Sequence, residues 1–526
     1  MNQASNFQLW LQFQPPFQAN PIYISFCLFF IFILLLLKLL PSKKQSPNFP
    51  PSPPKLPVIG NLHQLGTLPH QSLASLSQKY GPLMLLKLGQ TPTLVVSSAK
   101  MAREVMKTHD LIFSNRPKTR ATNLLFYGCQ DVGFAPYGEN WRQAKKMCVL
   151  ELFSLKRVES FQYIRDEEID TLINRIHKAA NCSVGGGGEG LNLSQLFSQI
   201  SNNIVSRCVM GKKFEDENGK SKYGEVSRRT IELLSVFCVG DFFPSFGWVD
   251  VIRGVVGEMK LVSKKMDEFY DMVIEEHITK SRSDEANDHK MDFVDIMLQL
   301  NNQDDMLDYH FTRDNLKGII QDMFAGGSDT TATTLEWTMA ELIRSPNTMK
   351  KVQEEIRTIV GKNKAKIETN DIRKMEYMKC VIKESLRLHP PVPLLVPRET
   401  LDMVDIEGYH VESGTSVFVN VWAIQRDPEI WESPNEFIPE RFMNEKKSVD
   451  FKGLDFELIP FGSGRRKCPG LAFGLASLEC VLASLLYWFD WKLPQDMKGE
   501  VLDMSEVHGI TIHKKFPLFL HPLPYR

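Results

Sequence analysis

The segment 461–470, FGSGRRKCPG, places one cysteine, Cys468, among glycines and directly after three basic residues. Three kinds of site could contain such a thiol: a phosphate-binding loop, a structural turn with an incidental cysteine, and a loop that holds a thiolate for a metal. A phosphate site does not fit, because Lys467 stands where the dinucleotide fingerprint needs its later glycine and no P-loop sequence is present. A thiolate fits better. Pro469 suits the first turn of a helix, and the dipole and nearby cations lower the pKa of a thiol at a helix N-terminus.

A second unusual segment, FAGGSDTTATT at 324–334, lies inside a long helical pattern. Its glycines and threonines are poor helix formers, and a local rule broken in a regular helix often marks function. The Thr330 hydroxyl can bond to the carbonyl of Gly326, four residues earlier, and so open or bend the helix. The missing side chains at Gly326 and Gly327 would leave room for a small ligand beside the helix. The alternative is a solvated Asp329–Thr330 pair at a helix kink.

A third group consists of charged residues. Glu384 and Arg387 are three residues apart and therefore share one helix face, and Arg441 lies downstream in FIPERF at 437–442. Taken alone, such a pair is common on helix surfaces and indicates no function.

The pattern F-x-x-G-x-R-x-C-x-G in 461–470 resembles the haem-binding signature of the cytochrome P-450 superfamily. The resemblance covers essentially the whole chain after the N-terminal segment. It is strongest to the plant A-type microsomal haem-thiolate monooxygenases, through FAPYGENWR at 134–142 and PERF at 439–442. It implies that Cys468 is the axial thiolate of the iron in haem b, which donates electron density and favours O–O cleavage. Phe461 would pack beside the sulfur and Gly464 would permit a tight turn under the porphyrin. Arg466 would pair with a haem propionate, and Gly470 closes the cofactor-binding pattern.

The same resemblance assigns roles to the other two groups. In such monooxygenases the matching acid and alcohol deliver protons during O2 activation, so Asp329 and Thr330 are the predicted catalytic relay. Glu384, Arg387 and Arg441 would form a buried ionic triad that locks the core beneath the haem. Because breaking a buried ion pair is costly, we predict a structural role for these three.

Further haem contacts follow from matching positions. Trp141 resembles the family's tryptophan at the haem edge, and Arg398 matches an arginine that pairs with a propionate. The family pattern Trp-x-x-x-Arg is not met, because Lys145 stands in its last place. Lysine lacks the bidentate fork of arginine, so Lys145 is expected to hold a propionate less rigidly, and whether it replaces the arginine at all stays open.

The family resemblance places four regions around the distal pocket: 119–127, 320–334, 392–396 and 508–511. Their apolar content indicates a lipophilic small-molecule substrate, although ordinary core packing explains any one residue equally well. The predicted pocket residues are Leu124, Phe126, Ala325, Gly326, Leu394, Val396 and Ile510.

The scaffold that must position these groups is predicted to be mainly α with a small β region, as in the cytochrome P-450 fold. Amphipathic periodicity predicts helices at 72–79, 99–108, 141–151, 167–180, 259–278, 314–344, 348–360, 375–388 and 471–488, and strands at 83–88, 93–96 and 416–421. The glycine-rich run 185–190 and the polar run 281–290 are predicted to be exposed loops.

The N-terminal residues predict a membrane anchor. Segment 22–40 is apolar apart from Lys38 and is about as long as a bilayer is thick; the residues before it are uncharged, whereas lysines follow it. We therefore expect a lumenal tail at 1–21, a transmembrane signal-anchor helix at 22–40, a basic and proline-rich hinge at 41–60, and a cytosolic haem-thiolate monooxygenase domain at 61–526. The expected location is the endoplasmic reticulum membrane, with a single pass.

Composition excludes some classes of function. The 62 basic and 63 acidic residues give no electrostatic case for a nucleic-acid partner. Nine scattered cysteines without a C-x-x-C pair argue against a disulfide framework or a zinc cluster.

The resemblance implies O2 as co-substrate and electrons from NADPH, delivered by an NADPH-dependent cytochrome P-450 reductase, with cytochrome b5 as a further electron-donor candidate. The substrate is expected to be a small hydrophobic plant metabolite, with a leaning towards an aromatic amino-acid-derived aldoxime, similar to phenylacetaldoxime, converted to a hydroxynitrile. The alternatives are a terpenoid or phenylpropanoid hydroxylase, a haem-thiolate isomerase or dehydratase that does not use O2, and a membrane-tethered haem sensor. The predicted basic face for the reductase consists of Arg142, Lys145, Lys146, Arg465 and Lys467.

Overall fold

The computed structural model describes residues 47–182, 190–214, 222–281, 290–302, 309–443 without 363 and 365, and 449–525, together with Phe29. The chain divides into two units, Met1–Asn48 and Phe49–Arg526. The second unit is described below. The expected tail and most of the expected anchor lie outside the described residues, as do most of the two expected loops at 185–190 and 281–290.

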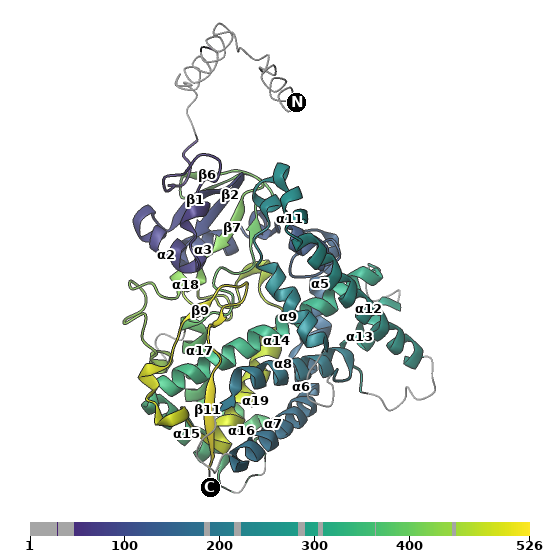
Figure 1. Ribbon diagram of the computed structural model, residues 1–526, viewed down its shortest axis with the longest axis vertical. Coiled ribbons are helices and arrows are strands. Elements are labelled where there is room, and N and C mark those ends of the chain that lie inside the picture. The colour runs from purple at the N-terminus through teal and green to yellow at the C-terminus, as the bar shows by residue number, and fades with distance from the viewer. Residues whose placement is uncertain are drawn as a thin grey trace, which may run out of the picture. The chain divides into compact units, whose positions relative to one another are not determined.

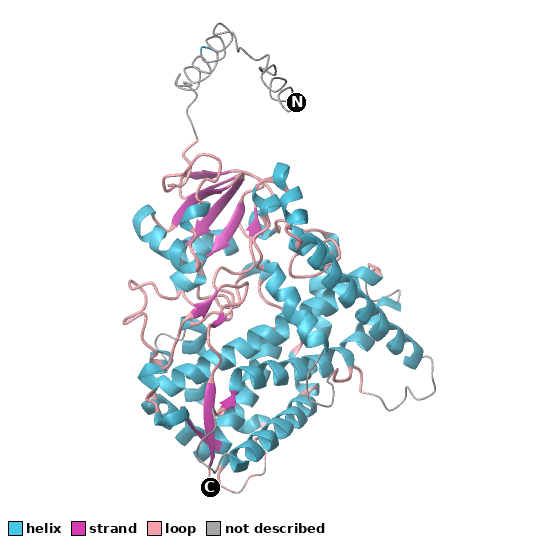
Figure 2. Cartoon of the chain, viewed as in Figure 1, coloured by secondary structure: helices cyan, strands magenta, loops and turns pink. Residues whose placement is uncertain are grey.

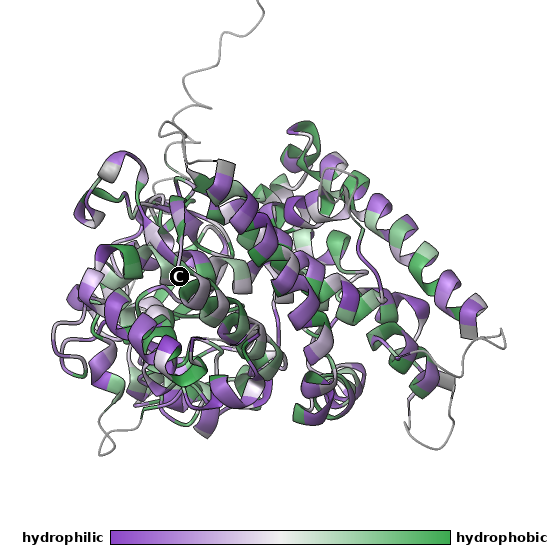
Figure 3. Ribbon diagram, turned by 90° about the horizontal axis from the view of Figure 1, so that it is seen from below, coloured by the Kyte–Doolittle hydropathy of each residue, from purple (hydrophilic) through white to green (hydrophobic). Residues whose placement is uncertain are grey.

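The second unit is mostly helical, and its strands form small sheets (Figures 1 and 2). Most of its helices carry both hydrophobic and hydrophilic residues (Figure 3), as expected for helices with one buried face. The α-helices are α2 (Pro69–Tyr80), α3 (Ala99–Arg103), α4 (Arg120–Leu125), α5 (Glu139–Met147), α6 (Leu155–Ser160), α7 (Gln162–Cys182), α8 (Leu193–Met210), α9 (Lys222–Leu234), α10 (Val239–Phe242), α11 (Trp248–Ile252), α12 (Val255–Ser281), α13 (Phe293–Asn302), α14 (Arg313–Arg344), α15 (Pro346–Val360), α16 (Thr369–Arg373), α17 (Glu376–Leu388), α18 (Val421–Ile424) and α19 (Leu471–Trp488).

The largest sheet of the described residues has the strand order β1-β2-β7-β4. Strand β1 (Leu83–Leu88) pairs antiparallel with β2 (Thr91–Val96), β2 pairs parallel with β7 (Ser416–Val419), and β4 (Arg398–Glu399) pairs antiparallel with β7. Three smaller sheets join β3 (Leu191–Asn192), β11 (Phe519–Pro524) and β8 (Phe489–Lys492); β9 (Glu506–Val507) and β10 (His513–Lys514); and β5 (Val404–Ile406) and β6 (Tyr409–Val411).

Helix α14 is the central element for the site. Thr312 caps it, accepting from the Asn315 N–H while the Asn315 side chain accepts from the Thr312 N–H. Its residues are buried on nearly all sides, which marks a helix enclosed by others rather than one lying on the surface. It packs most extensively against α8, and also contacts α17 and α19. These helices form the main hydrophobic core, and the β1-β2-β7 sheet covers a separate cluster.

The predicted mainly helical fold with a small β region is confirmed. Helices α14, α17 and α19 were predicted to within a residue of their ends, whereas α8, the main partner of α14, was not predicted. Its sequence, LSQLFSQISNNIVSRCVM, mixes serine and asparagine into the apolar pattern, which weakens the helical signal.

From Phe49 onwards, the proline-rich stretch before β1 belongs to the second unit and packs against the rest of that unit. The Leu85 N–H donates to the Pro51 carbonyl at 2.9 Å, and the amide of the buried Asn61 donates to the Pro53 carbonyl at 3.3 Å.

Among the described residues, α19 is long and apolar enough to cross a membrane, and so is the bent pair 223–242 and 244–252. Helix α19 is mostly buried inside the protein, which identifies it as a core helix.

Candidate active site

A cavity of about 340 Å³ lies in the helical core. Its walls come from α5, α8, α9 and α14, from the loop before β4, and from the loop that leads into α19. The lining is largely apolar, and the polar groups are concentrated at a few positions, as in small-molecule sites.

Cys468 lines this cavity and is exposed. Its backbone N–H donates to the Phe461 carbonyl at 3.0 Å, which closes the loop before α19. The pKa of the thiol is nevertheless raised, because burial outweighs the opposite effects of Lys145, the Gly470 N–H and Lys467. The sequence predicted a lowered pKa for this thiol, and for the protein without a bound metal that prediction is wrong. The thiol is exposed only to an enclosed cavity, where a thiolate is less well solvated than in bulk water. A metal bound here would deprotonate the thiol itself.

Two glycines shape the Cys468 loop. Gly462 lines the cavity with φ of +67°, and Gly464 begins the 3₁₀ turn η10 (Gly464–Arg466) with φ of +70°. A Cβ on Gly464 would lie 2.3 Å from the Met106 carbonyl oxygen and 2.4 Å from Asp110 Oδ1. Gly464 is thus required by the close approach of the π-helix η2 (Glu104–Thr108), which follows α3, and of Asp110 to this loop. It does not itself line the cavity.

Three arginines line one side of the cavity. Arg466 donates to the Ser114 carbonyl at 2.7 Å, and Arg398 donates to the Ser463 carbonyl at 2.9 Å with Asp110 at 3.5 Å. Burial and the neighbouring Arg398 lower the pKa of Arg466 to about 9. Burial lowers the pKa of Arg398 to about 10. Guanidiniums that are buried together and bonded mainly to carbonyls favour the binding of anionic groups.

The third arginine, Arg116, was not predicted. It donates to the carbonyls of Gly133 at 2.9 Å, Val396 at 2.5 Å and Pro397 at 2.7 Å. Burial, Arg466 and Arg398 lower its pKa well below the usual value. The sequence feature that could have identified Arg116 is FSNRP at 113–117, in which a charged residue stands between an apolar segment and a proline. The three guanidiniums and the cavity-facing thiol fit a flat cofactor that carries carboxylates and a metal, as haem does.

Trp141 and Lys145 from α5 also line the cavity. The indole N–H of Trp141 donates to the Val132 carbonyl at 3.1 Å, and the Arg466 guanidinium lies 4.1 Å from its ring centroid. The Lys145 ammonium donates to the Lys467 carbonyl. Burial lowers the pKa of Lys145 to about 8. Lys145 thus faces the Cys468 loop.

Helix α14 contributes a row of small and hydroxyl residues. The Thr330 hydroxyl donates to the Gly326 carbonyl at 2.6 Å, as the sequence indicated, and both residues line the cavity. The helix continues without interruption through this point. Asp329 does not line the cavity; its carboxylate lies 3.3 Å from His513 Nε2. Consecutive helical residues point in directions about 100° apart, so Asp329 does not point in the same direction as Thr330.

A pair of buried carboxyls, Asp131 and Asp322, was not predicted. Asp322 lines the cavity and accepts from the backbone N–H groups of Val132 at 2.6 Å and Gly133 at 2.9 Å. Burial raises the pKa of Asp322 to about 6. Burial and the charge of Asp322 raise the pKa of Asp131 well above its usual value. The charge of one carboxyl thus acts on the pKa of the other, and the two titrate as an interacting pair.

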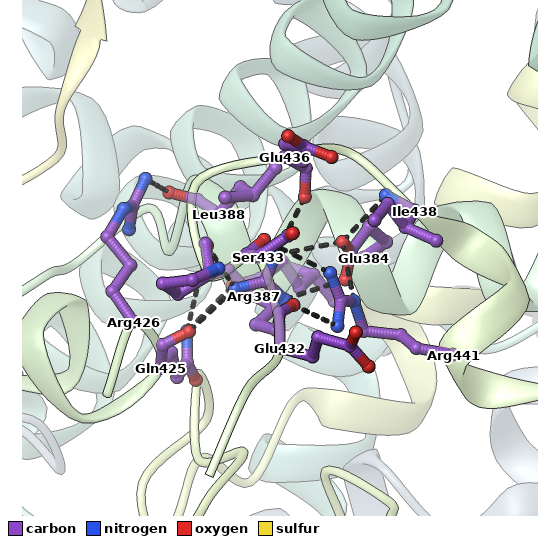
Figure 4. A network of polar contacts seen from close by, with 12 residues as sticks. Glu384, Arg387, Leu388, Gln425, Arg426, Glu432, Ser433, Glu436, Ile438 and Arg441 are labelled. Carbon is purple, nitrogen blue, oxygen red and sulfur yellow. Dashed lines mark hydrogen bonds and ion pairs between the residues drawn. The ribbon is translucent and has the colours of Figure 1, made fainter. Parts of the chain in front are cut away.

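The structure brings Glu384, Arg387 and Arg441 together (Figure 4). Glu384 binds Arg387 at 2.7 Å and Arg441 at 3.0 Å, and the side chains of Glu384 and Arg387 are fully buried. Backbone carbonyls complete the arginines' hydrogen bonds: Gln425, Pro434 and Glu436 accept from Arg387, and Glu432 and Ser433 accept from Arg441. The group therefore ties α17 to the segment 425–441.

The predicted pocket residues are divided by the structure. Phe126, Ala325, Gly326, Val396 and Ile510 line the cavity, as do Phe461 and Gly470 of the cysteine loop. Leu124 and Leu394 do not. Leu124 packs in the cluster between α4, α9 and α12, and Leu394 packs against the cluster under β1 and β2. The lining contributed by α8 and α9 was missed: Val205, Val209, Ile231 and Leu234.

The predicted basic docking face is smaller than expected. Lys145 is turned inward, as described above, and Arg142 is paired with Glu139 on its own helix. Arg465 lies 3.4 Å from Asp110, and Lys467 donates to the Lys452 carbonyl at 2.5 Å. Lys146 is exposed.

Comparison with protein families identifies the family of this chain. The family model described as Cytochrome P450 matches residues 50–519, which include every site residue described above.

Comparison with curated proteins finds plant relatives. The chain is 52% identical over 473 residues to a phenylacetaldehyde oxime monooxygenase, CYP71AN24, of Prunus mume, covering 90% of this chain and 88% of the relative. It is 53% identical over 463 residues to cytochrome P450 71A1 of Persea americana, covering 88% of this chain and 90% of the relative. It is 48% identical over 476 residues to a strychnine-11-hydroxylase of Strychnos nux-vomica, covering 90% of this chain and 91% of the relative.

Comparison with solved structures finds the same fold. A zebrafish cytochrome P450 with abiraterone superposes with a TM-score of 0.72 at 24% identity, covering 87% of this chain and 100% of that chain. A second zebrafish cytochrome P450 structure, with progesterone, superposes with a TM-score of 0.72 at 26% identity, covering 87% of this chain and 99% of that chain.

Proposed function

Because this chain belongs to the cytochrome P450 family, whose members are haem-thiolate monooxygenases, we propose that it converts a small aromatic aldoxime into a hydroxynitrile. The observation that carries the choice of substrate is the 52% identity to a phenylacetaldehyde oxime monooxygenase across 90% of the chain. The apolar cavity is compatible with an aromatic substrate.

In this proposal Cys468 is the ligand of the haem iron, and Arg116, Arg398 and Arg466 bind the propionates. Bound haem supplies the activation of O2, with electrons from NADPH that the family receives through a reductase. The propionates would be ionised partners for the three arginines. Carboxylates neutralise buried positive charge, whereas backbone carbonyls do so only poorly. Lys145 holds the Lys467 carbonyl and so keeps the cysteine loop in place.

The residues of α14 would orient the reacting groups and move protons. The Thr330 hydroxyl lies at the cavity wall, where it can exchange its bond to the Gly326 carbonyl for one to a ligand. Asp329, one residue earlier, is the proton reservoir behind the wall. Phe126 and Val396 would surround the aromatic ring and exclude water.

The overall reaction has two balanced stages. Loss of water from the aldoxime, R-CH2-CH=NOH, gives the nitrile R-CH2-CN without net oxidation. Insertion of one oxygen atom of O2 at the adjacent carbon gives R-CH(OH)-CN, while two electrons and two protons convert the other oxygen atom to water. The second stage therefore depends on NADPH, whereas the first needs no net electron supply.

The test is conversion of phenylacetaldoxime by the full-length protein in microsomes with a reductase and NADPH. We expect a substrate-induced shift of the haem spectrum and formation of the hydroxynitrile, with the nitrile as an intermediate. Absence of both the spectral shift and the product, in a preparation with the normal reduced carbon-monoxide spectrum, would contradict the aldoxime proposal.

A second candidate is hydroxylation of a different plant metabolite. It is favoured by the 48% identity to a strychnine-11-hydroxylase over 90% of the chain, because a related sequence of similar length carries that activity. A panel of terpenoids, phenylpropanoids and alkaloids in the same spectral assay separates the two candidates. Tight binding of a panel member together with no response to the aldoxime would select this second function.

The proposal places the enzyme in the endoplasmic reticulum membrane, with a cytochrome P450 reductase as partner and cytochrome b5 as an additional donor. The support is the apolar segment 22–40 and the lysines after it. Deleting residues 2–40 should move the protein from the membrane fraction to the soluble fraction while the reduced carbon-monoxide spectrum is kept. Full membrane retention without residues 2–40 would contradict segment 22–40 as the principal anchor.

A further inference from the structure

Behind the cavity wall, Asp329 of α14 meets a histidine from a distant strand. His513, the first residue of β10, places Nε2 at 3.3 Å from Asp329 Oδ2 and Nδ1 at 2.9 Å from Thr333 Oγ1. Both ring nitrogens therefore face the same helix, and strand β10 contacts it directly. When the ring is protonated, it forms an ion pair with the buried Asp329 Oδ2, and Nδ1–H donates to the Thr333 hydroxyl.

This pair lies between solvent and the cavity. The His513 side chain is 36% exposed and that of Asp329 is 19% exposed, and neither residue lines the cavity. Thr330, which follows Asp329 directly, does line it. The order from outside to inside is therefore water, His513, Asp329 and Thr330.

The charges around His513 favour its protonated form. Burial alone would lower the pKa of the imidazole, but Asp329 and Glu336 on α14 outweigh it, and the pKa is raised. The opposing positive group is Arg228 on α9. Lys514, the next residue of β10, lies near Glu336. Its positive charge opposes the rise in the pKa of Glu336 that burial causes. The acidic neighbours of His513 thus favour a positive charge on its ring.

We propose that His513 is a positioning residue for oxygen chemistry in this enzyme: it holds the Asp329 carboxylate on the solvent side of α14 and passes protons to it from water. The inference rests on the proposed function, because it assumes that Asp329 and Thr330 serve a reaction in the cavity. His513 itself does not contact the substrate or the cofactor site.

The proton transfer is balanced without any further reactant. The imidazolium gives its Nε2 proton to Asp329 Oδ2, which leaves a neutral imidazole and a neutral carboxyl. The carboxyl then turns towards Thr330 and gives that proton to the Thr330 hydroxyl oxygen, while the hydroxyl proton passes into the cavity, where the reduction of O2 consumes it. A hydronium ion from the solvent restores the proton on Nε2. The bond from Nδ1 to Thr333 holds the ring in place throughout.

The first test compares His513→Gln with His521→Gln, a histidine change on strand β11. We expect His513→Gln to keep the normal reduced carbon-monoxide spectrum and substrate-induced spectral shift. Product formed per NADPH consumed should fall about tenfold, which is less than the loss expected on removal of a group that transfers a proton to the reacting atoms. The solvent deuterium isotope effect on product formation should rise. Unchanged product per NADPH and isotope effect in a protein with normal spectra would overturn the proposal. A missing carbon-monoxide spectrum in the wild type would instead refute the proposed function.

The second test does not depend on activity or on the stability of the His513 variant. The pKa of His513 is measured by hydrogen–deuterium exchange at the imidazole C2 position, in the wild type and in Asp329→Asn. Removing the charge of Asp329 should lower the pKa of His513, while His521 should not respond. An unchanged pKa of His513 would show that the two groups are not coupled, and the proposal would fail.

Discussion

Three guanidiniums, those of Arg116, Arg398 and Arg466, line one side of the cavity, and carbonyl oxygens accept most of their hydrogen bonds. On the adjoining wall, Asp131 and Asp322 form a carboxyl pair that burial keeps partly protonated. At the scale of residues, the site thus combines excess positive charge on one side with a neutralised acid pair on another. Both arrangements have consequences that can be measured.

The carboxyl pair predicts how stability depends on pH. Its folded pKa values are raised above the unfolded value of about 3.9, so its stabilising contribution is full below that value and is lost as pH rises through the folded pKa, about 6 for Asp322. Asp131→Asn keeps a donor towards Asp322 and cannot ionise. We expect its thermal midpoint, relative to the wild type, to be higher at about pH 8 than at about pH 4.

The control for this experiment is Asp170→Asn, at an exposed aspartate on α7. That variant should follow the wild type across the same pH range. If Asp131→Asn also follows the wild type, the buried carboxyl pair does not govern the pH dependence.

The sequence predicted those site residues that stand in one contiguous motif. Cys468, Phe461, Arg466 and Gly470 are close in sequence, and all of them line the cavity. Arg116 was not predicted because its hydrogen-bond partners come from other segments of the chain. Periodicity and spacing do not show which distant segments meet. The direction of the Cys468 pKa shift was also wrong, because it depends on burial, which only the assembled core determines.

At the scale of elements, the cysteine loop is held by its close approach to η2. Gly464→Ala would bring a Cβ to 2.3 Å from the Met106 carbonyl oxygen, and it would also strain a backbone at φ of +70°. We expect folded haem protein to be largely lost, since backbone strain alone costs about 1–3 kcal/mol and the clash adds to it. The yield of the reduced carbon-monoxide spectrum per mass of protein measures the effect.

The matched control is Gly408→Ala. Gly408 has a similar φ of +81°, and a Cβ added there meets no heavy atom within 4 Å. Equal losses in the two variants would mean that backbone strain alone, and not the approach of η2, explains the requirement for glycine at 464.

The ionic triad makes a second prediction about elements. Glu384→Ala leaves Arg387 fully buried and Arg441 largely buried without their shared carboxylate. Breaking a buried ion pair costs about 3–5 kcal/mol, so we expect a loss of that size in the free energy of unfolding, measured by chemical denaturation.

Glu376→Ala, on the same helix, removes an exposed carboxylate that pairs with Lys379. Exposed pairs contribute about 0–1 kcal/mol. A similar, small loss in the free energy of unfolding of Glu384→Ala and Glu376→Ala would contradict the structural role of the triad.

Elements were predictable where a continuous apolar run was present. The predicted strand 83–88 coincides with β1, and the predicted helix 471–488 coincides with α19. Strands such as β3, β9 and β10 consist of two residues each and have no period to detect. This is why the meeting of His513 on β10 with Asp329 on α14 is visible only in the folded chain.

At the scale of the whole molecule, one fold brings the cysteine loop, helix α14 and the arginines around a single cavity, although they are separated by hundreds of residues. The family match spans residues 50–519, so the part of the chain that builds the cavity is also the part that defines the family. The relatives named above carry different activities at similar identity, so the fold by itself does not identify the substrate.

The most direct measurement of the central claim, a haem-thiolate enzyme with Cys468 as the iron ligand, is the reduced carbon-monoxide difference spectrum of Cys468→Ser. The control is Cys148→Ser, at a second cysteine that lines the same cavity. We predict that the wild type and Cys148→Ser show the long-wavelength Soret band of thiolate-ligated haem and that Cys468→Ser does not. Retention of that band in Cys468→Ser would contradict the account.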